Sequence, residues 1–208
     1  KMGYRTVGIN YLGDYGTQFG KLVYAYKTWG DEKKIKKNPM AELKQLYVKF
    51  HEEAELNPLL EDEGRKYFKK IEENDPDTLK LWHWIKNESL KSFMETYNLL
   101  GITDFDSYEG EASSVDKVDN VMAELEAKGL LEENEGAQII RFAENMAPAL
   151  IKRTDGASLY IARDLAAILY RMKVYHFDEI LYVVGNEQTL HFRQLKLIIK
   201  KMKYSWAD

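Results

Sequence analysis

The chain has 208 residues, 45% hydrophobic and 31% charged, with 14 Tyr, 8 Phe and 4 Trp, a composition that excludes a disordered chain and suits a large buried core. Its formal net charge is −4, without the basic excess of a dedicated nucleic-acid binder, so any contact with nucleic acid would be local. The chain has no Cys, which excludes disulfides and thiolate zinc sites. Its four His are scattered along the sequence, which argues against a His-based metal site. No apolar run approaches membrane-spanning length.

The first predicted elements are a strand, a glycine-rich loop and a helix. Residues 4–10 give a short strand signal. After the loop we expect a helix over residues 18–29, with Thr17 as its N-cap and Gly30 as its stop. The charged sequence DEKKIKKN, residues 31–38, then predicts a solvated connector.

Three amphipathic helices follow. Asn38 is a good N-cap and Pro39 suits the first helical position. Pro58 starts a second helix, and the sequence NDPDT starts a third, long one that Gly101 ends. We interpret this block, residues 31–110, as a helical insertion with its aromatic side chains in a core. The apolar stripe of the third helix comprises Trp82, Ile85, Phe93, Tyr97 and Leu100.

The next part combines a helix with two hairpins. Residues 102–111 read as strand and loop, and residues 114–128 as a helix that Gly129 ends. The sequence LLEENEGAQII predicts a hairpin that turns near residues 134–136. The sequence ALIKRTDGASLY predicts a second hairpin that turns at residues 155–156, where Asp-Gly is a strong turn signal.

The last stretch alternates helix, strand and helix. We expect helices over residues 161–175 and 189–202, and between them the sequence EILYVV, residues 179–184, as a strand buried on both faces. This alternation predicts an α/β fold with a doubly wound parallel sheet that is incomplete and is interrupted by the helical insertion. The expected divisions are 1–30 (first part of the α/β core), 31–110 (helical insertion), 111–155 (helix and hairpin segment) and 156–208 (second part of the core).

The loop after the last predicted strand is the first candidate site. Ligands of open α/β sheets bind at the carboxyl ends of strands, and Gly185 lets a ligand approach the backbone closely. Glu187 and Gln188 offer groups that could bind a ribose or an amino acid, and His191 follows Gln188 on the same side of the helix start. The alternative is an ordinary loop with Thr189 as the helix N-cap.

The start of the preceding helix is the second candidate site. If the helix begins near Tyr160, Tyr160 and Asp164 share a face. We place Asp164 on the first turn, where the helix dipole favours the ionised carboxylate. A carboxylate beside a phenol suits a cationic ligand, and a guanidinium could bind it through two parallel hydrogen bonds. The alternative is structural, with Asp164 paired to a residue such as Arg171 and Tyr160 in the core.

The glycine-rich loop is the third candidate site, because a glycine turn at a helix N-terminus can hold an anion. Its sequence GDYGTQFG matches neither GxxxxGK[ST] nor GxGxxG. In addition, the carboxylate of Asp14 would repel a phosphate. The sequence therefore argues against a phosphate cradle.

Four blocks of the chain resemble, in order, the catalytic domain of class I arginyl-tRNA synthetases. They read INYLGDYGTQFGKL, EGAQII, DGASLYIARDLAAILYR and YVVGNEQTLHFRQL, and their combination is specific. The stretch between Gly30 and Gly101 also resembles the helical insertion of that family. The resemblance implies a Rossmann-like class I synthetase fold.

The resemblance also implies roles for individual residues. Tyr160 and Asp164 would line an arginine pocket, with Asp164 in contact with the guanidinium, and Gln188 would contact the amino-acid end. No residue of this chain is expected to be catalytic in the sense of a nucleophile. The expected substrates are L-arginine, ATP with Mg²⁺, and tRNA(Arg).

The same comparison places further residues near the nucleotide. Gly185, Glu187 and His191 would face the ATP ribose and the adenylate, and Asp14 and Gln18 would border the same cleft. We expect no bound metal and no prosthetic group. We also expect a cytoplasmic monomer that binds neither DNA nor a membrane.

Two signatures of the family are missing from the 208 residues. Neither the HxGH-type motif, which binds ATP phosphates, nor the KMSK-type loop is present. We therefore expect a piece of a longer arginine–tRNA ligase that is inactive alone. One alternative is a non-catalytic binding or regulatory module of the same fold. Another, a nucleotidyl transferase, is disfavoured because it would also need a phosphate-binding signature.

Overall fold

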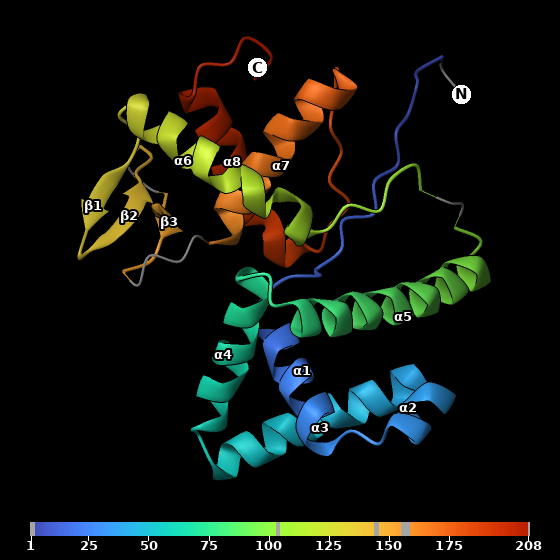
Figure 1. Cartoon of the computed structure of the whole chain (residues 1–208). Coiled ribbons are helices and arrows are strands. Elements are labelled where there is room, and N and C mark those ends of the chain that lie inside the picture. Colours follow the sequence, from blue (N-terminus) through green and yellow to red (C-terminus); the bar gives the residue numbers. More distant parts are fainter. Residues whose placement is uncertain (1–2, 103–104, 144–145, 155–158, 208) are drawn as a thin grey trace. The chain divides into compact units, whose positions relative to one another are not determined.

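The computed structural model describes residues 3–102, 105–143, 146–154 and 159–207. The chain divides into two compact units, Lys1–Tyr108 and Glu109–Asp208, each of which has its own hydrophobic core (Figure 1). The first unit is helical. The second combines helices with a small antiparallel sheet.

The helices of the first unit begin and end close to the local signals in the sequence. Asp75 caps the long helix by accepting from the Thr78 N–H at 2.9 Å, and Gly101 ends it in the left-handed conformation at φ 67°. Gly16, rather than Thr17, occupies the N-cap position of the first helix. The helices are α1 (Thr17–Trp29), α2 (Glu32–Lys37), α3 (Pro39–Leu56), α4 (Leu60–Glu72) and α5 (Pro76–Leu100).

The predicted solvated connector at residues 31–38 is wrong, because this segment contains helix α2. The Asp31 carboxylate accepts from the backbone N–H groups of Lys33 and Lys34, which starts the helix. Ile35 is only 1% exposed and packs in a cluster with residues of α1 and α3. One buried side chain therefore makes this charged segment part of the fold.

Two strand predictions in the first unit are also wrong. Residues 4–10 form no strand, and the passage at 102–111 forms none within its described residues. Within the first unit a parallel bridge joins Ile9 and Ser107, and the Asn10 N–H donates to the Ser107 carbonyl at 2.8 Å. A one-residue bridge does not supply the repeated hydrogen bonds of a sheet.

The aromatic stripe of α5 is buried only in its first half. Trp82 is 7% exposed, and its indole N–H donates to the Asp14 carbonyl at 3.0 Å. Ile85 is also buried, as predicted. Farther along, however, Phe93 is 41% exposed and Leu100 68% exposed, so the prediction of a continuous apolar face is wrong there.

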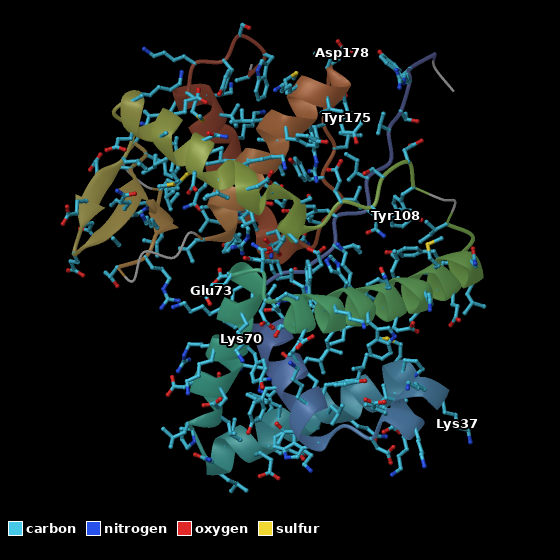
Figure 2. All side chains as sticks on the ribbon, viewed as in Figure 1. Lys37, Lys70, Glu73, Tyr108, Tyr175 and Asp178 are labelled. Atoms are coloured by element: carbon cyan, nitrogen blue, oxygen red, sulfur yellow. The ribbon has the colours of Figure 1, made fainter. Side chains whose placement is uncertain are left out.

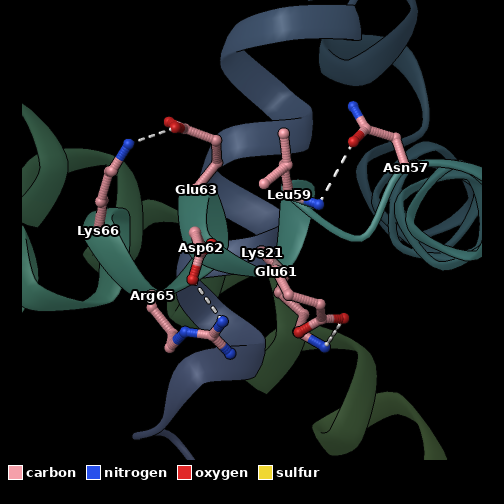
Figure 3. Close-up of polar contacts among 8 residues, drawn as sticks. All are labelled: Lys21, Asn57, Leu59, Glu61, Asp62, Glu63, Arg65 and Lys66. Atoms are coloured by element: carbon pink, nitrogen blue, oxygen red, sulfur yellow. Dashed lines mark hydrogen bonds and ion pairs between the residues drawn. The ribbon is translucent and has the colours of Figure 1, made fainter.

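Helices α1 and α4 cross at two glycines. A Cβ atom on Gly20 would lie 2.1 Å from the Gly64 carbonyl oxygen and 2.5 Å from the Phe68 nitrogen. The side chains add one ion pair between the two helices, Lys21 to Glu61 at 2.8 Å (Figure 3). The close approach of the backbones thus requires glycine at position 20.

Other charge pairs in Figure 3 lie within α4. Arg65 pairs with Asp62 at 2.5 Å and Lys66 with Glu63 at 2.5 Å, in both cases three residues apart. These side chains are largely exposed, so each pair contributes only a few tenths of a kcal/mol. These pairs form a polar, exposed surface on α4 but do not determine how α4 packs against α1.

The second unit contains the first predicted hairpin. Strands β1 (Glu132–Asn134) and β2 (Ala137–Ile140) pair antiparallel, and β3 (Ala149–Lys152) pairs antiparallel with β2. Glu135 and Gly136 make the turn, both with positive φ (53° and 78°), as a two-residue hairpin turn requires. The sheet order is therefore β1-β2-β3.

Three helices complete this unit, α6 (Val118–Ala127), α7 (Tyr160–Tyr175) and α8 (Thr189–Lys201), with a 3-10 helix, Glu111–Lys117, before α6. Figure 1 shows α6, α7 and α8 packed together beside the sheet. Side chains from all three helices and from β2 and β3 make one continuous core. Its fully buried members include Leu125, Ile140, Ile151, Leu165 and Ile198.

Two predictions in the second unit fail in part. β3 pairs with β2 and not with a strand after it, and the predicted turn at residues 155–156 lies outside the described residues. The predicted buried strand at residues 179–184 is wrong, since Leu181 is 78% and Val183 98% exposed. Nothing among the described residues pairs with it, so its apolar pattern lacks the hydrogen-bonding partners that a strand needs.

The chain after α8 is held to α6 by a small polar cluster. The Tyr204 hydroxyl donates to the Glu124 carboxylate at 2.6 Å, and Lys128 donates to the Met202 carbonyl at 2.7 Å. The Lys128 ammonium also lies 5.4 Å from the centre of the Tyr204 ring. Burial, the hydrogen bond to Glu124 and its negative charge raise the pKa of Tyr204.

We predict that Gly20→Ala destabilises the first unit by about 1–3 kcal/mol, although alanine normally favours a helix over glycine by about 1 kcal/mol. The added methyl group overlaps backbone atoms of α4, which cannot move aside as a side chain can. Urea unfolding measures the loss. Gly13→Ala is the control, because nothing lies within 4 Å of its added Cβ. Equal stability of the Gly20→Ala and Gly13→Ala proteins would contradict the crossing.

We predict that Tyr204→Phe costs about 1 kcal/mol at neutral pH, the usual value of one hydrogen bond. Because the folded state raises the pKa of Tyr204 above 10.0, its contribution is complete below pH 10 and is lost as pH rises through the folded pKa. The difference in unfolding free energy between the wild-type and Tyr204→Phe proteins should therefore shrink above pH 10. A difference that stays constant up to pH 11 in urea titrations would oppose this assignment.

Candidate functional site

The N-terminal end of α7 positions Tyr160 and Asp164. The helix begins at Tyr160, as predicted, after Leu159 donates its N–H to the Ile151 carbonyl of β3 at 3.0 Å. Ile161 and Leu165 point into the core at 4% and 0% exposure. Tyr160, 50% exposed, and the next residue on its face, Asp164, therefore lie at the edge of that core.

One element of the sequence argument for Asp164 fails. The helix dipole acts mainly within the first turn, and the first turn of α7 contains no acidic residue. Asp164 lies one turn farther along, and its side chain is only 16% exposed. Its ionised form needs a hydrogen-bond donor from elsewhere.

That donor comes from the first turn of α8. His191 Nε2 lies 2.6 Å from Asp164 Oδ2, and the His191 side chain is 6% exposed. The Tyr160 ring lies against the imidazole, with 4.7 Å between ring centres and 49° between planes. The structure thus brings Tyr160, Asp164 and His191 together in the second unit.

The burial of His191 follows from the helical repeat of α8. Its buried side chains are those of residues 191, 194, 195, 198 and 199, which recur every three or four residues. Leu190, the neighbouring apolar residue, lies off this face and is 49% exposed. Extending the same repeat backwards selects His191 instead, so the signal was present in the sequence.

The segment before α8 is exposed. Residues 186–188 form a 3-10 turn, and the Gln188 N–H donates to the Gly185 carbonyl at 3.0 Å. The Glu187 carboxylate lies over Gly185, 2.5 Å from where a Cβ would be. Thr189 does not cap α8, since its hydroxyl donates to the Asn186 carbonyl at 2.6 Å. Gly185, Glu187 and Gln188 are accessible to a ligand, and no contact joins them to Asp164 among the described residues.

Sequence reasoning missed two neighbours of this site, Tyr182 and Phe192. The Tyr182 ring lies against Phe192, with 4.5 Å between ring centres and 39° between planes. Burial raises the pKa of the Tyr182 phenol, and the Asp164 charge adds to this, whereas the Arg171 guanidinium opposes it. Tyr182 was missed because in the sequence it is one of the apolar residues of the predicted strand at 179–184.

Arg171, which the sequence offered as a possible partner of Asp164, is 4% exposed and pairs with Glu109 at 3.3 Å. The Tyr175 hydroxyl donates to the same carboxylate at 3.0 Å. Figure 2 labels Tyr175 near the C-terminal end of α7. Arg171, Tyr175 and Glu109 thus link α7 to the segment before α6.

The glycine-rich loop belongs to the first unit, where its polar side chains have local partners. Asp14 is 3% exposed, and its carboxylate contacts the Lys86 ammonium. The Gln18 amide donates to the Tyr15 carbonyl at 2.9 Å. The Asp14 charge is thus matched by a lysine of α5, so Asp14 has a structural partner within the first unit.

The chemistry of the site follows from its charges and burial. A mostly buried carboxylate beside an aromatic ring suits a cationic, hydrogen-bonding ligand. The described residues contain no group of three His, Asp or Glu that could hold a metal ion. None of the described helices is long and apolar enough to cross a membrane.

Comparison with known proteins supports the resemblance. The family model "tRNA synthetases class I (R), catalytic domain" matches residues 1–207. Arginine–tRNA ligases of Lactobacillus johnsonii and Lactobacillus acidophilus are 57% and 55% identical over all of this chain, which spans 37% of the length of each. The crystal structure of arginyl-tRNA synthetase from Plasmodium falciparum has a TM-score of 0.77 and 26% identity, covering 98% of this chain and 34% of that one.

The family model spans nearly every residue, including the blocks around Asp164 and His191. The relatives in two bacteria match over the complete chain. The chain belongs to the class I tRNA synthetases, in the family of the arginine (R) catalytic domain.

Proposed function

We propose that this chain is part of an arginine–tRNA ligase, which activates L-arginine with ATP and transfers it to tRNA(Arg). The observation that carries the proposal is Asp164, a mostly buried carboxylate with one oxygen, Oδ1, that has no partner among the described residues. The family and the named relatives support the same reaction.

We propose that Tyr160, Asp164 and Gln188 bind arginine. The guanidinium is cationic and planar and presents N–H donors, so a carboxylate is its natural partner. The half-exposed Tyr160 ring offers a surface beside it, and the exposed amide of Gln188 can reach the amino-acid end. A neutral side chain of similar shape would leave the Asp164 charge unpaired, which gives selectivity for arginine.

The nucleotide side of the proposal uses the exposed segment before α8. Gly185 and Glu187 would face the ribose and adenylate of ATP, whose Mg²⁺ arrives with the substrate, and His191 follows in the same segment. Asp14 and Gln18 would be further polar residues on the nucleotide side. In the complete ligase, residues 1–30 and 156–208 would belong to a doubly wound Rossmann-like core, although their described residues form no strand in this structure.

The remaining divisions are proposals of the same kind. Residues 31–110 would be a helical insertion and residues 111–155 a helix and hairpin segment of the insertion or core. The whole protein would act in the cytoplasm as a monomer, without DNA or membrane partners.

The reaction needs no nucleophile from this chain. The arginine carboxylate attacks the α-phosphorus of ATP, the bond to the β-phosphate oxygen breaks, and pyrophosphate leaves. A terminal ribose hydroxyl of the tRNA then attacks the acyl carbon of arginyl-adenylate, and AMP leaves. Such catalysis depends on holding the reactants in line and stabilising charge on the phosphate. This chain contributes the side chains that fix the position of arginine.

We predict that Asp164→Ala raises the KM for arginine about 10- to 100-fold in a complete ligase that carries this sequence, with a smaller effect on the KM for ATP. The loss corresponds to about 1.5–3 kcal/mol for a hydrogen bond to a charged group. Arginine-dependent ATP–pyrophosphate exchange measures both constants. Asp178→Ala removes an exposed carboxylate just after α7 and serves as the control (Figure 2). An unchanged arginine KM in Asp164→Ala would refute the pocket.

We also predict that the 208-residue chain alone does not catalyse this exchange. Neither phosphate-binding signature of the family occurs in its sequence, so nothing within it stabilises the charge that develops on the α-phosphate. The chain is assayed beside a complete ligase at equal concentration. Arginine-dependent exchange above the protein-free rate would show that the chain holds a complete active site.

A further inference from the structure

The contact between Asp164 and His191 assigns the proton of the imidazole. An ionised carboxylate only accepts hydrogen bonds, so at 2.6 Å the ring nitrogen facing it, Nε2, carries the hydrogen. In the neutral ring the other nitrogen, Nδ1, is then an acceptor. It is buried and has no partner among the described residues. A buried acceptor without a partner costs less than a buried donor without one, so this tautomer fits the site.

The burial of His191 argues against a contact with the nucleotide. One ring nitrogen is engaged by Asp164 and the other is inaccessible. Two aromatic rings also lie against the imidazole, Tyr160 at 4.7 Å and Phe192 at 5.0 Å between ring centres. No polar atom of His191 is left to meet an adenylate, although the resemblance had suggested that role.

The same contact restricts how Asp164 meets a ligand. Its Oδ2 atom is held by α8, which fixes the rotation of the carboxylate about its own axis. Oδ1, which has no donor among the described residues, is the oxygen most open to the N–H groups of a guanidinium. The expected pairing therefore centres on Oδ1, while Oδ2 keeps only its second lone pair for a further donor.

We propose that His191 is a positioning residue for arginine recognition: it holds Asp164 by Oδ2 so that Oδ1 faces the guanidinium. This inference rests on the proposed arginine pocket. The ordering of the carboxylate before arginine arrives lowers the entropy cost of binding, which appears as a lower KM for arginine. His191 acts through Asp164 and touches no substrate atom.

The test compares two replacements of His191 in a complete ligase that carries this sequence. His191→Phe keeps an aromatic ring against Tyr160 and Phe192 but removes the N–H donor. His191→Gln removes the ring but carries an amide N–H of similar reach. We expect His191→Phe to raise the KM for arginine about 10-fold, the effect of one hydrogen bond to a charged group, and His191→Gln to raise it less. The KM for ATP should change by less than about 2-fold in both, because neither change touches a group that binds ATP.

A second comparison separates positioning from simple support of the fold. In Asp164→Asn the amide oxygen must turn toward His191 Nε2–H, which leaves the NH₂ group facing the guanidinium, donor against donor. Adding His191→Phe frees the amide to rotate. We expect the double variant to have a several-fold lower arginine KM than Asp164→Asn alone, although the same His191 change raises the KM of the wild type.

Gln194→Leu is the control for lost stability. Gln194 is another buried polar side chain of α8, and its amide donates to the Ala147 carbonyl at 2.9 Å, away from Asp164. This variant should melt at a lower temperature with an unchanged KM for arginine.

The outcomes distinguish this inference from the function on which it rests. If Asp164→Ala raises the arginine KM but His191→Phe does not, the positioning role is wrong and the pocket stands. A rise in the ATP KM alone would place His191 at the nucleotide and overturn the inference. If the double variant is as weak as Asp164→Asn or weaker, His191 does not control the orientation of residue 164. If Asp164→Ala itself has no effect, the proposed pocket fails, and the inference fails with it.

Discussion

A carboxylate that loses most of its contact with water must gain a hydrogen-bond donor, and at Asp164 that donor is the imidazole of His191. This requirement bears on the packing of two helices as well as on one hydrogen bond. It determines that α8 presents His191, and not Leu190, to the core, and that the first turn of α8 lies next to the second turn of α7. The core residues beneath, such as Leu165 and Leu195, keep the two helices at that separation. Packing and charge thus specify the same arrangement.

The first unit depends on a residue without a side chain, Gly20, whereas the second depends on the paired side chains of Asp164 and His191. Gly20 lets the backbone of α1 lie against that of α4, and Lys21 beside it pairs with Glu61 across the crossing. In the same unit, Lys86 and the indole of Trp82 hold Asp14 from α5. Each unit therefore buries a carboxylate of interest, paired with a lysine at Asp14 and with an imidazole at Asp164.

Local signals in the sequence were the more reliable ones. Asp75 and Gly101 mark the ends of α5 because capping involves only neighbouring residues, and Glu135-Gly136 makes the first hairpin for the same reason. Segments whose state depends on distant partners were predicted less well: residues 31–38 fold because Ile35 meets a core, and residues 179–184 find no strand to pair with among the described residues.

In the candidate site, too, the local features were predicted and the contacts between distant residues were not. The spacing of Tyr160 and Asp164 on one face follows from the helical repeat, and the structure agrees with it. The bond from Asp164 to His191 joins residues 27 apart, and only the crossing of two helices brings them together. No local pattern could have given the tautomer of His191 or the single free oxygen of Asp164.

The open run at residues 181–184 has a practical consequence for handling the protein. Leu181, Val183 and Val184 combine high β-propensity with exposures of 78%, 98% and 50%, and their backbone is not part of any described sheet. Such a segment is a template for pairing with another copy of itself. Asp178 and Glu179, just before it, are the charges that oppose this self-association. Self-association of this run should therefore be strongest near the isoelectric point of about 5.7, where the net charge that keeps copies of the chain apart vanishes.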